Sequence, residues 1–418
     1  MINDKPDGAS PVIVVVGLGY VGLPLAVGFA KSGLKVIGYD INLQRVSELK
    51  EGRDRNNDVT KEELKKIGTR ITFTTNENEI ANSNFVIISV PTPLKPNNEP
   101  DLNYVESASH AVGKHIRKGA IVVYESTVYP GCTEEFCLPI LENESKMKLG
   151  EFYIGFSPER MNPGDSGHSV GKIVKLISAS HPEALEVMKD IYSRITKTHS
   201  MSSIMAAESA KIIENVQRDI NIALFNELSM LFDKLGLDSS EVFDGAATKW
   251  NFIRYKPGLV GGYCIPVNPH YLAYKAHQIG FDPELILAGR KTNDRMPAFI
   301  ASKAKHLSPN GRVLILGASY KENVAELRSS RIKNLVESLK LEGFSDMQMY
   351  DPLFLDREVF GLKNEKPSGK FDLIIYAVAH DALAGIKVDQ LLETDGAVID
   401  IQRRLDRRKF DGIRYWAP

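Results

Sequence analysis

The sequence predicts an α/β protein in which two Rossmann-like, doubly wound α/β domains are joined by a helical central domain with a long helix. Three observations indicate this architecture. An apolar run at 12–16 leads into a glycine-rich turn, and a second apolar run at 312–316 starts another α/β series. Between them, a helical pattern runs from Met205 to about Leu235 without Gly or Pro. Continuous apolar runs of this kind are typical of parallel strands covered on both faces.

The first domain, expected at 1–202, alternates strand and helix. After the strand at 12–16, further buried strands are expected at 84–90 (NFVIISV) and 120–124 (AIVVY). The segments between these strands are long enough for crossover helices. This alternation predicts a doubly wound sheet.

The central domain, expected at 203–300, is helical. Its long first helix carries apolar residues at helical spacing, namely Ile213, Val216, Ile220, Ala223 and Leu224. More helix is expected through about Arg295. The third domain, expected at 301–418, continues from the strand at 312–316 with strands at 347–350, 372–378 and, as the last one, 397–401.

The composition limits the class of partner. The chain has 418 residues, 43% hydrophobic and 25% charged, and a net charge of -1, which gives no general attraction to nucleic acid or to an anionic membrane. Its three cysteines, Cys132, Cys137 and Cys264, argue against a disulfide framework and fit a reducing compartment. Neither a secretory signal nor a membrane-spanning apolar run is apparent, so a cytoplasmic protein with a small ligand and no metal is expected.

The turn after the first strand, Gly17-Leu-Gly-Tyr-Val-Gly22, has the pattern of a dinucleotide site. Gly17 permits the tight turn, Gly19 lets the backbone approach a pyrophosphate, and Gly22 allows close helix packing. The N–H groups at the helix N-terminus bind the anion. Asp40 ends the next strand, where it can accept hydrogen bonds from ribose hydroxyls and repel a 2′-phosphate, so NAD is favoured over NADP. Arg45 either approaches the adenosine phosphate or is a solvated helix charge.

A second glycine-rich segment, at 258–269 (GLVGGYCIPVNP), surrounds Cys264. Such a loop brings backbone amides against a ligand and leaves a thiol exposed, whereas an inert structural cysteine normally lies in an apolar helix or strand. A nucleophilic thiol also needs a polar or cationic neighbour, because its ordinary pKa is about 8.5. Lys211 and Asn215, four residues apart on one helix face, supply an ammonium and an amide, although this spacing equally fits a solvated face.

Five segments together resemble the nucleotide-sugar 6-dehydrogenase family, which includes the UDP-glucose and GDP-mannose dehydrogenases. They follow the family's order along almost the whole chain: VVGLGYVGLPLA at 15–26, SPERMNPGD at 157–165, ESAKIIENVQRDINIALFNE at 208–227, PGLVGGYCIPVNPHYL at 257–272 and GASYKENVAELRSS at 317–330. SPERMNPGD and TKWNFIRYKPGLVGG are most similar to the bacterial UDP-N-acetylhexosamine branch. The resemblance implies NAD as cofactor, a UDP-sugar as substrate, and a homodimer built on the central helix.

The resemblance also implies a mechanism. A first hydride passes from C6 of the sugar to NAD, the resulting aldehyde is captured by Cys264 as a thiohemiacetal, a second hydride transfer gives a thioester, and water hydrolyses it. Lys211 and Asn215 match the residues that stabilise the oxyanion through a bound water. Thr127 matches a water-holding threonine, and Glu159 matches the glutamate that promotes hydrolysis.

The binding residues that the family match implies fall into two sets. For the cofactor they are Gly17, Gly19, Tyr20, Val21, Gly22, Asp40, Arg45, Val90, Pro91, Thr92, Thr127 and Arg328. For the UDP-sugar they are Glu159, Arg160, Lys211, Asn215, Arg254, Tyr255, Gly261, Arg290, Tyr320 and Lys321. Arg290 is expected to reach into the partner subunit of the dimer.

Two positions of the cysteine loop depart from the family pattern. Asn268, which belongs to the catalytic set, stands where an acidic residue is usual, and Tyr263 stands where a histidine commonly precedes the cysteine. Both changes alter the electrostatics around the thiol. They motivate a second interpretation, a non-catalytic protein that binds NAD and a nucleotide-sugar. A β-hydroxyacid dehydrogenase, which needs no cysteine loop, and UDP-glucose as the substrate are further alternatives.

Overall fold

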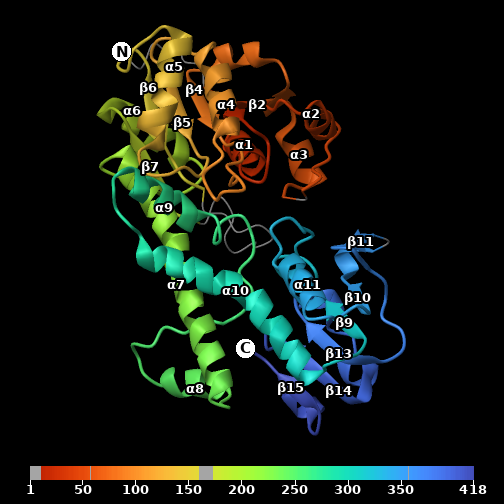
Figure 1. The fold of residues 1–418 in the computed structure, drawn as a ribbon. Helices are drawn as coiled ribbons and strands as arrows, with labels where there is room; N and C mark the ends of the chain where they lie inside the picture. Colours follow the sequence, from red (N-terminus) through yellow and green to blue (C-terminus); the bar gives the residue numbers. More distant parts are fainter. Residues whose placement is uncertain (1–10, 57, 160–172, 356) are drawn as a thin grey trace. The chain divides into compact units, whose positions relative to one another are not determined.

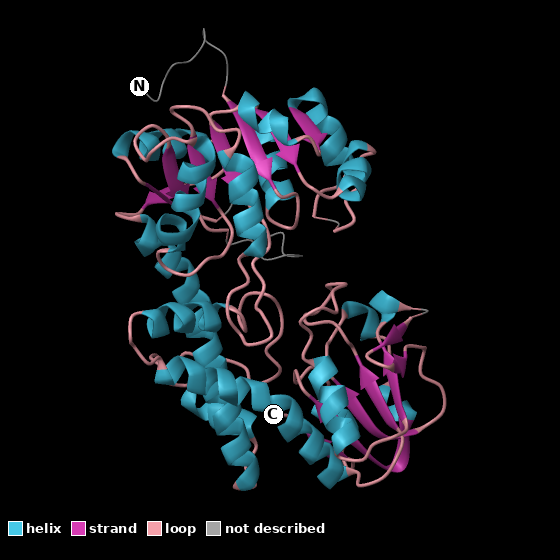
Figure 2. Ribbon diagram, turned by 45° about the horizontal axis from the view of Figure 1, so that its top comes forward, coloured by secondary structure: helices cyan, strands magenta, loops and turns pink. Residues whose placement is uncertain are grey.

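The computed structural model describes residues 11–56, 58–159, 173–355 and 357–418. The chain divides into two compact units. The first comprises the chain up to Glu214 together with 270–280, and the second comprises 215–269 and 281–418. Each unit contains a sheet flanked by helices, as Figures 1 and 2 show, so the predicted α/β class with two parallel sheets and a helical middle is confirmed.

The sheet of the first unit has the strand order β3-β2-β1-β4-β5-β6-β7-β8. The order 3-2-1-4-5-6 is that of a Rossmann fold. All neighbours pair in parallel except β6 and β7, which are antiparallel. The strands are β1 (Val12–Val16), β2 (Lys35–Tyr39), β3 (Ile71–Thr74), β4 (Phe85–Ile88), β5 (Ile121–Tyr124), β6 (Tyr153–Phe156), β7 (Lys175–Ala179) and β8 (Thr198–Ser200).

The helices of this unit cover the sheet because their apolar faces are buried against it. Helix α1 is the most enclosed, with Leu25 and Phe29 fully buried in one core with Ile13 and Val15 of β1. The helices are α1 (Gly22–Lys31), α2 (Leu43–Lys50), α3 (Lys61–Ile67), α4 (Asn103–Gly113), α5 (Leu138–Ser145) and α6 (Pro182–Ser193). The glycine-rich turn therefore lies at the carboxyl end of β1, the edge at which α/β sheets bind ligands.

The long helix α7 (Ile204–Lys234) runs from the first unit into the second, and its predicted extent is confirmed. Its apolar residues at helical spacing are not all on one buried face. Val216 and Ala223 are buried, but Ile213 and Leu224 are 53% and 52% exposed. The helix therefore presents apolar side chains on more than one face, which an amphipathic pattern on a single face does not explain.

The second unit has a parallel sheet with the order β10-β9-β13-β14-β15. Its strands are β9 (Val313–Leu316), β10 (Met347–Tyr350), β13 (Phe371–Tyr376), β14 (Leu392–Asp400) and β15 (Arg414–Trp416), with a separate pair, β11 (Glu358–Val359) and β12 (Leu362–Lys363). The strand expected last, at 397–401, overlaps β14, and β15 follows it.

Four further helices complete the described chain: α8 (Ser239–Ala246), α9 (Asn268–Gln278), α10 (Glu284–Leu307) and α11 (Ile332–Leu341). Helix α10 continues past Arg295, where the helical pattern was expected to end. Between α8 and α9 the chain forms turns and irregular structure, which places the glycine-rich segment in a loop. Among the residues with described structure, no helix is long and apolar enough to cross a membrane.

Candidate active site

The glycine turn of the first unit has the shape that a dinucleotide requires. Gly17 has φ +89°, and a Cβ there would lie 2.8 Å from the Ser89 carbonyl oxygen. A Cβ on Gly22 would lie within 2.4 Å of Ser89 Oγ, so this glycine is needed for packing. A Cβ on Gly19 would meet nothing within 4 Å. The space at Gly19 is open, and the first N–H groups of α1 are beside it, so the turn fits a pyrophosphate.

Asp40 closes the end of β2 beside this turn. Its carboxylate accepts the Leu18 N–H at 2.8 Å and the Asn42 N–H at 2.9 Å, which fixes its position. Arg45 is 5% exposed, pairs with Asp54 at 2.7 Å and donates from Nε to the Leu18 carbonyl at 2.8 Å. The interpretation of Arg45 as a solvated charge is therefore wrong, because its guanidinium is buried and stabilises the glycine turn through the Leu18 carbonyl.

The ends of β4 and β5 lie together at the same edge. Ser126 Oγ accepts the Val90 N–H at 2.9 Å and donates to the Val90 carbonyl at 2.8 Å. Thr92 accepts a hydrogen bond from the Tyr271 hydroxyl at 2.9 Å through its carbonyl. Thr127 follows Ser126 and is half-buried, and Pro91 is exposed. The predicted cofactor residues of this segment are thus held by their backbone, while Tyr20 and Val21 remain partly exposed on the turn.

Glu159 lies just beyond β6 in a cluster of buried charges. Its carboxylate is 3.3 Å from Lys175 Nζ, which also lies 2.7 Å from Glu125. Burial raises the pKa of Glu125 to about 7. Glu125 and Lys175 are not among the site residues expected from the sequence, although a charged residue directly flanking an apolar strand run, as in IVVYE and KLIS, signals a buried ion pair. Arg160, the next predicted residue, lies outside the described residues.

Helix α7 carries Lys211 and Asn215, and both side chains are buried. The alternative of a solvated face for this pair is therefore wrong. Glu208, one turn earlier, accepts the Gly131 and Thr133 N–H groups, the latter at 2.9 Å, and burial raises its pKa to about 7. Glu208 is not among the site residues expected from the sequence, although its i, i+3 spacing to Lys211 was an available signal.

Cys264 is exposed and lies one turn before α9. Its carbonyl accepts the Asn268 N–H at 3.0 Å, so the thiol-bearing residue is joined to the first residue of that helix. Asn215 Nδ2 donates to Asn268 Oδ1 at 2.9 Å, and both amides are buried. A helix N-terminus favours a thiolate, because its dipole end is positive. Cys132 and Cys137, in contrast, are buried.

The cysteine loop packs on the segment that follows β9. Gly262 donates its N–H to the Ser329 carbonyl at 3.1 Å, and a Cβ on Gly261 would lie 2.8 Å from the same oxygen. The Arg328 guanidinium lies 5.6 Å from the centre of the Tyr263 ring. Tyr263, which stands where the family commonly has a histidine, therefore contacts Arg328, which is predicted to bind the cofactor. Histidine would not reproduce this cation–π arrangement in the same form.

A buried polar cluster stabilises the segment with Tyr320 and Lys321. Ser319 Oγ donates to the Lys321 carbonyl at 2.8 Å and lies 3.1 Å from His380 Nε2. Asp351, at the end of β10, lies 3.0 Å from the same nitrogen and accepts the Ala318 N–H at 2.7 Å. The His380 contact, after burial, is the largest influence on Asp351 and holds the pKa of that carboxyl below its ordinary value.

The remaining predicted substrate residues are held within the second unit. Arg254 is ion-paired with Asp244, and the Tyr255 hydroxyl accepts a hydrogen bond from Gln217 at 3.2 Å. Arg290 is 2% exposed and ion-paired with Asp219 and Asp294. This burial goes against the expectation that Arg290 reaches into a partner subunit, because its guanidinium already faces two carboxylates of its own chain.

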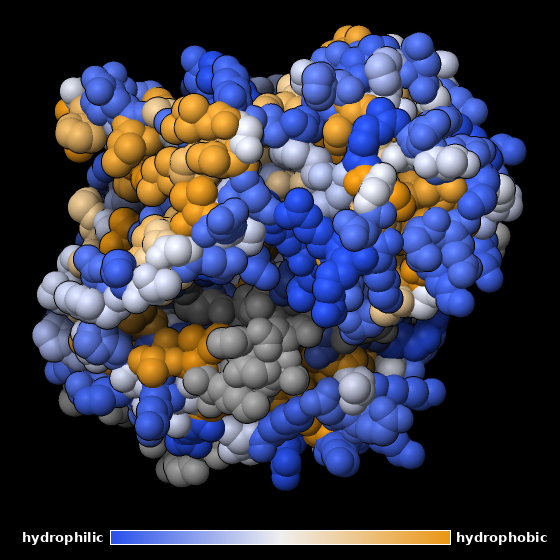
Figure 3. All heavy atoms as spheres, turned by 90° about the horizontal axis from the view of Figure 1, so that it is seen from below, coloured by the Kyte–Doolittle hydropathy of each residue, from blue (hydrophilic) through white to orange (hydrophobic). Residues whose placement is uncertain are grey.

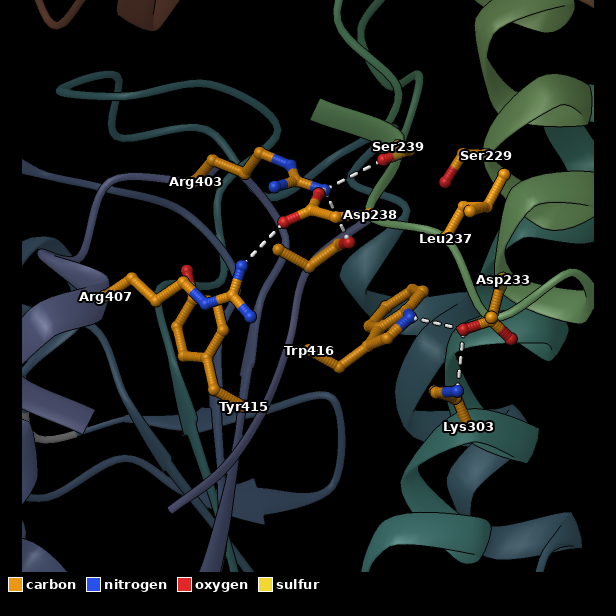
Figure 4. Close-up of a pocket in the computed structure, with 12 residues that line it drawn as sticks. Ser229, Asp233, Leu237, Asp238, Ser239, Lys303, Arg403, Arg407, Tyr415 and Trp416 are labelled. Atoms are coloured by element: carbon orange, nitrogen blue, oxygen red, sulfur yellow. Dashed lines mark hydrogen bonds and ion pairs between the residues drawn. The ribbon is translucent and has the colours of Figure 1, made fainter. Parts of the chain in front are cut away.

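A pocket of about 270 Å³ lies elsewhere in the second unit, between the end of α7 and the C-terminal strand (Figure 4). Asp238 there pairs with Arg403 at 3.0 Å and with Arg407 at 2.7 Å, while Asp233 pairs with Lys303 at 2.6 Å. None of the predicted site residues lines it. Since these charges neutralise one another, the pocket is a poor match for the predicted chemistry.

Comparison with known proteins gives the class. Models of three domains of the UDP-glucose/GDP-mannose dehydrogenase family match the chain in order: the NAD binding domain at 12–196, the central domain at 205–295 and the UDP binding domain at 314–407. The chain is therefore an NAD-dependent nucleotide-sugar dehydrogenase, an oxidoreductase.

Relatives along the full length agree. The chain is 46% identical over 408 residues to Protein CapL of Staphylococcus aureus, covering 93% of this chain and 95% of CapL. It is 42% identical to a UDP-N-acetyl-D-glucosamine 6-dehydrogenase of Pseudomonas aeruginosa, covering 96% of this chain and 98% of the relative. The structure of a UDP-N-acetyl-D-mannosamine dehydrogenase from Pyrococcus horikoshii has a TM-score of 0.86 at 28% identity, covering 97% and 98%. The chain belongs to the UDP-glucose/GDP-mannose dehydrogenase family.

Proposed function

We propose that this chain oxidises the C6 hydroxyl of a UDP-N-acetylhexosamine, with UDP-N-acetylglucosamine as the first candidate, to the uronic acid. The observation that carries the proposal is the exposed Cys264 thiol, one turn before α9, with the buried Asn215–Asn268 pair joined to the same turn. The two relatives named UDP-N-acetyl-D-glucosamine 6-dehydrogenase, 42% and 45% identical, support the choice of sugar.

The proposed mechanism has a covalent stage on Cys264. NAD, bound at the turn around Gly19, takes up the two electrons of each oxidation. The thiol adds to the C6 aldehyde, the second oxidation leaves a thioester, and water releases the acid. Lys211 and Asn215 donate to the developing oxyanion, and one well-placed donor of this kind contributes about 3 kcal/mol. Thr127 orients water, and Glu159 accepts its proton.

The division of labour follows the predicted domains. Residues 1–202 bind NAD, 203–300 form the helical centre, and 301–418 bind the UDP moiety through Tyr320 and Lys321. The nucleotide-sugar also contacts Arg254, Tyr255 and Gly261. Arg328 contacts the cofactor.

We further propose a homodimer built on α7. Its exposed large apolar side chains, Met205, Ile213, Leu224 and Leu231, are unusual for a helix in contact with water. Figure 3 shows apolar side chains at several places on the molecular face seen there. A second copy of the helix would cover the α7 side chains. Sedimentation equilibrium of wild type and Leu224→Glu, which introduces a charge on this surface, tests the proposal: a shift of the mass toward the monomer is expected.

The experiment that tests the activity counts NADH formed per UDP-sugar consumed, with limiting sugar and a panel of UDP-hexoses and UDP-N-acetylhexosamines. Two NADH per UDP-N-acetylhexosamine, lost in Cys264→Ala and retained in the buried-cysteine control Cys137→Ala, are expected. Greater activity with UDP-glucose would change the substrate. NAD binding without NADH from any sugar would overturn the enzyme proposal and favour a binding protein.

A further inference from the structure

The antiparallel strand β7 places a lysine opposite the proposed hydrolytic glutamate. Phe156 of β6 pairs with Ser178 of β7. In an antiparallel register, the residue three positions after Phe156 faces the residue three positions before Ser178. These are Glu159 and Lys175. The one antiparallel pairing among the described neighbours of this sheet therefore determines which side chain faces Glu159.

Lys175 is the centre of the buried cluster. Its ammonium lies 2.7 Å from Glu125 Oε2, 3.2 Å from the Pro158 carbonyl and 3.3 Å from Glu159 Oε2. An ammonium has three hydrogens, so these contacts use all of its donors. Two of the contacts fall on consecutive residues, the backbone of Pro158 and the side chain of Glu159. Lys175 thus holds both the backbone at Pro158 and the carboxylate of Glu159 in place.

The charges of the cluster are buried and are paired around Lys175. The side chains of Glu125 and Lys175 are 0% and 6% exposed, and that of Glu159 is 12% exposed. Burial raises the pKa of Glu125 to about 7, although the Tyr192 hydroxyl donates to it at 2.6 Å. Burial acts to lower the pKa of Lys175, but Glu125 and Glu159 outweigh it and raise that pKa. When Glu125 takes up a proton near neutral pH, the positive charge of Lys175 is left opposite Glu159.

A buried ammonium lowers the stability of the folded protein unless it is well paired. A protein with an apolar side chain of similar volume in its place is often no less stable. Packing alone therefore does not account for a lysine here. We infer that Lys175 is a positioning residue for thioester hydrolysis, holding the Glu159 carboxylate oriented as the general base; this rests on the proposed function.

In that step, the water oxygen bonds to the thioester carbon while one water proton passes to Glu159. The C–S bond then breaks and its electron pair goes to Cys264 Sγ, which takes the proton back from Glu159. The carboxylic acid finally loses its own proton to solvent. Loss of the Lys175 charge should slow this step and leave the two oxidations in place, so the acylated enzyme should accumulate.

The experiment compares wild type with Lys175→Met, Glu125→Gln/Lys175→Met and Lys175→Arg, all in the full chain. The double variant removes both buried charges together, which avoids an unpaired Glu125 and protects the fold. Rapid quench with UDP-N-acetylglucosamine, followed by intact mass spectrometry, measures the acyl adduct on Cys264. Steady-state kinetics between pH 5 and 9 give kcat, KM and the pH of half-maximal hydrolysis.

For the double variant we expect an accumulating adduct, a kcat reduced about 100-fold, as for loss of general-base catalysis, and little change in KM. Its pH profile should also differ from that of wild type, because the ammonium that contacts Glu159 is gone. Among the described residues, the charged or titratable groups facing Glu159 are Lys175, Glu125 and Tyr192. Lys175→Arg, which keeps the charge, should restore the wild-type pH profile.

A double variant with wild-type kcat and pH profile would overturn the role of Lys175 while leaving the proposed function intact. Failure of the proposed function has a different signature: wild type itself would form no adduct on Cys264 and would not release two NADH per sugar, and the inference would fall with it. If Lys175→Met is unfolded and the double variant is folded, the double variant alone decides.

Discussion

Asn215 of α7 donates its side-chain amide to the side-chain oxygen of Asn268, the first residue of α9, across 2.9 Å. Asn268 stands where the family usually has an acidic residue, and it keeps the role of hydrogen-bond acceptor without the charge. The geometry around the cysteine turn is therefore maintained by a neutral pair.

This pair predicts a measurable coupling. Asn268→Leu should lower the free energy of unfolding by ~1–3 kcal/mol, because the Asn215 amide loses its buried acceptor. The double variant Asn215→Leu/Asn268→Leu should lose less than the sum of the two single variants. Urea denaturation of the four proteins measures this difference. Strict additivity would contradict the hydrogen bond as an energetic link.

Alanine substitutions of Gly19 and Gly22 in the dinucleotide turn should differ in their effects on stability and on NAD binding. Gly19→Ala should fold with a stability near that of wild type, because its Cβ meets nothing within 4 Å, but should weaken NAD binding by about tenfold or more because the pyrophosphate needs that space. Gly22→Ala should lose several kcal/mol, since its Cβ would overlap Gly17 and Ser89. Calorimetric titration with NAD, together with thermal unfolding, separates the two. Equal loss of stability in both variants would be inconsistent with this geometry.

The charge of Asp40 is expected to set the preference for NAD over NADP. Replacing it with asparagine keeps an acceptor for the Leu18 N–H but removes the charge that repels a 2′-phosphate. The ratio of kcat/KM for NAD over NADP should fall about tenfold or more, equivalent to ~1.4 kcal/mol. Steady-state kinetics with both cofactors measure the ratio. Glu48 of α2, which pairs with Arg55 at 2.6 Å and is not among the predicted cofactor residues, offers the control Glu48→Gln, which should leave the preference unchanged.

Glu208 predicts a loss of stability as the pH rises. Its pKa is about 7 in the folded chain and 4.5 in its ordinary state, mainly because of burial. Between these values the native state binds more protons than the unfolded state, so the free energy of unfolding falls from about pH 4.5 to about pH 7 and then levels. The contribution of Glu208 is at most ~3 kcal/mol. Glu125 adds to the same window, with a pKa of about 7.

Urea denaturation across that pH range, in wild type and Glu208→Gln, measures the contribution. The variant should be less stable at pH 5, where it lacks an acceptor for one of the two N–H groups, and should show a flatter decline toward pH 7. A matched substitution of the exposed Glu62 to Gln should keep the wild-type slope. If Glu208→Gln retained that slope, Glu208 would not be the group that titrates.

The fold was largely predictable because its strands are continuous apolar runs. The predicted strand at 12–16 matches β1, and the predicted strand at 347–350 matches β10. The strand β15 was missed because RYW has only three residues and begins with a charged one, so it forms no apolar run. Local pattern also could not reveal the antiparallel direction of β7, which depends on pairing with β6 rather than on the sequence of β7.

Residues that depend on local sequence were predicted better than those that depend on distant partners. The turn at Gly17 and Gly22 has the expected backbone because a fingerprint next to a strand specifies it. Arg290 shows the opposite case. Its burial depends on Asp219, which lies 71 positions away in the chain, and no local pattern marks that pair.

The carboxylates at the ends of β2 and β10 are alike in one respect and different in another. Asp40 and Asp351 each accept an N–H from the turn after the first strand of their sheet, from Leu18 and Ala318. Asp40 is partly exposed, whereas Asp351 is fully enclosed by His380 and the Leu353 N–H. A ribose can reach the first carboxylate and not the second. The sheet of the NAD binding domain and the sheet of the UDP binding domain therefore differ at the position where a carboxylate could accept a ribose hydroxyl.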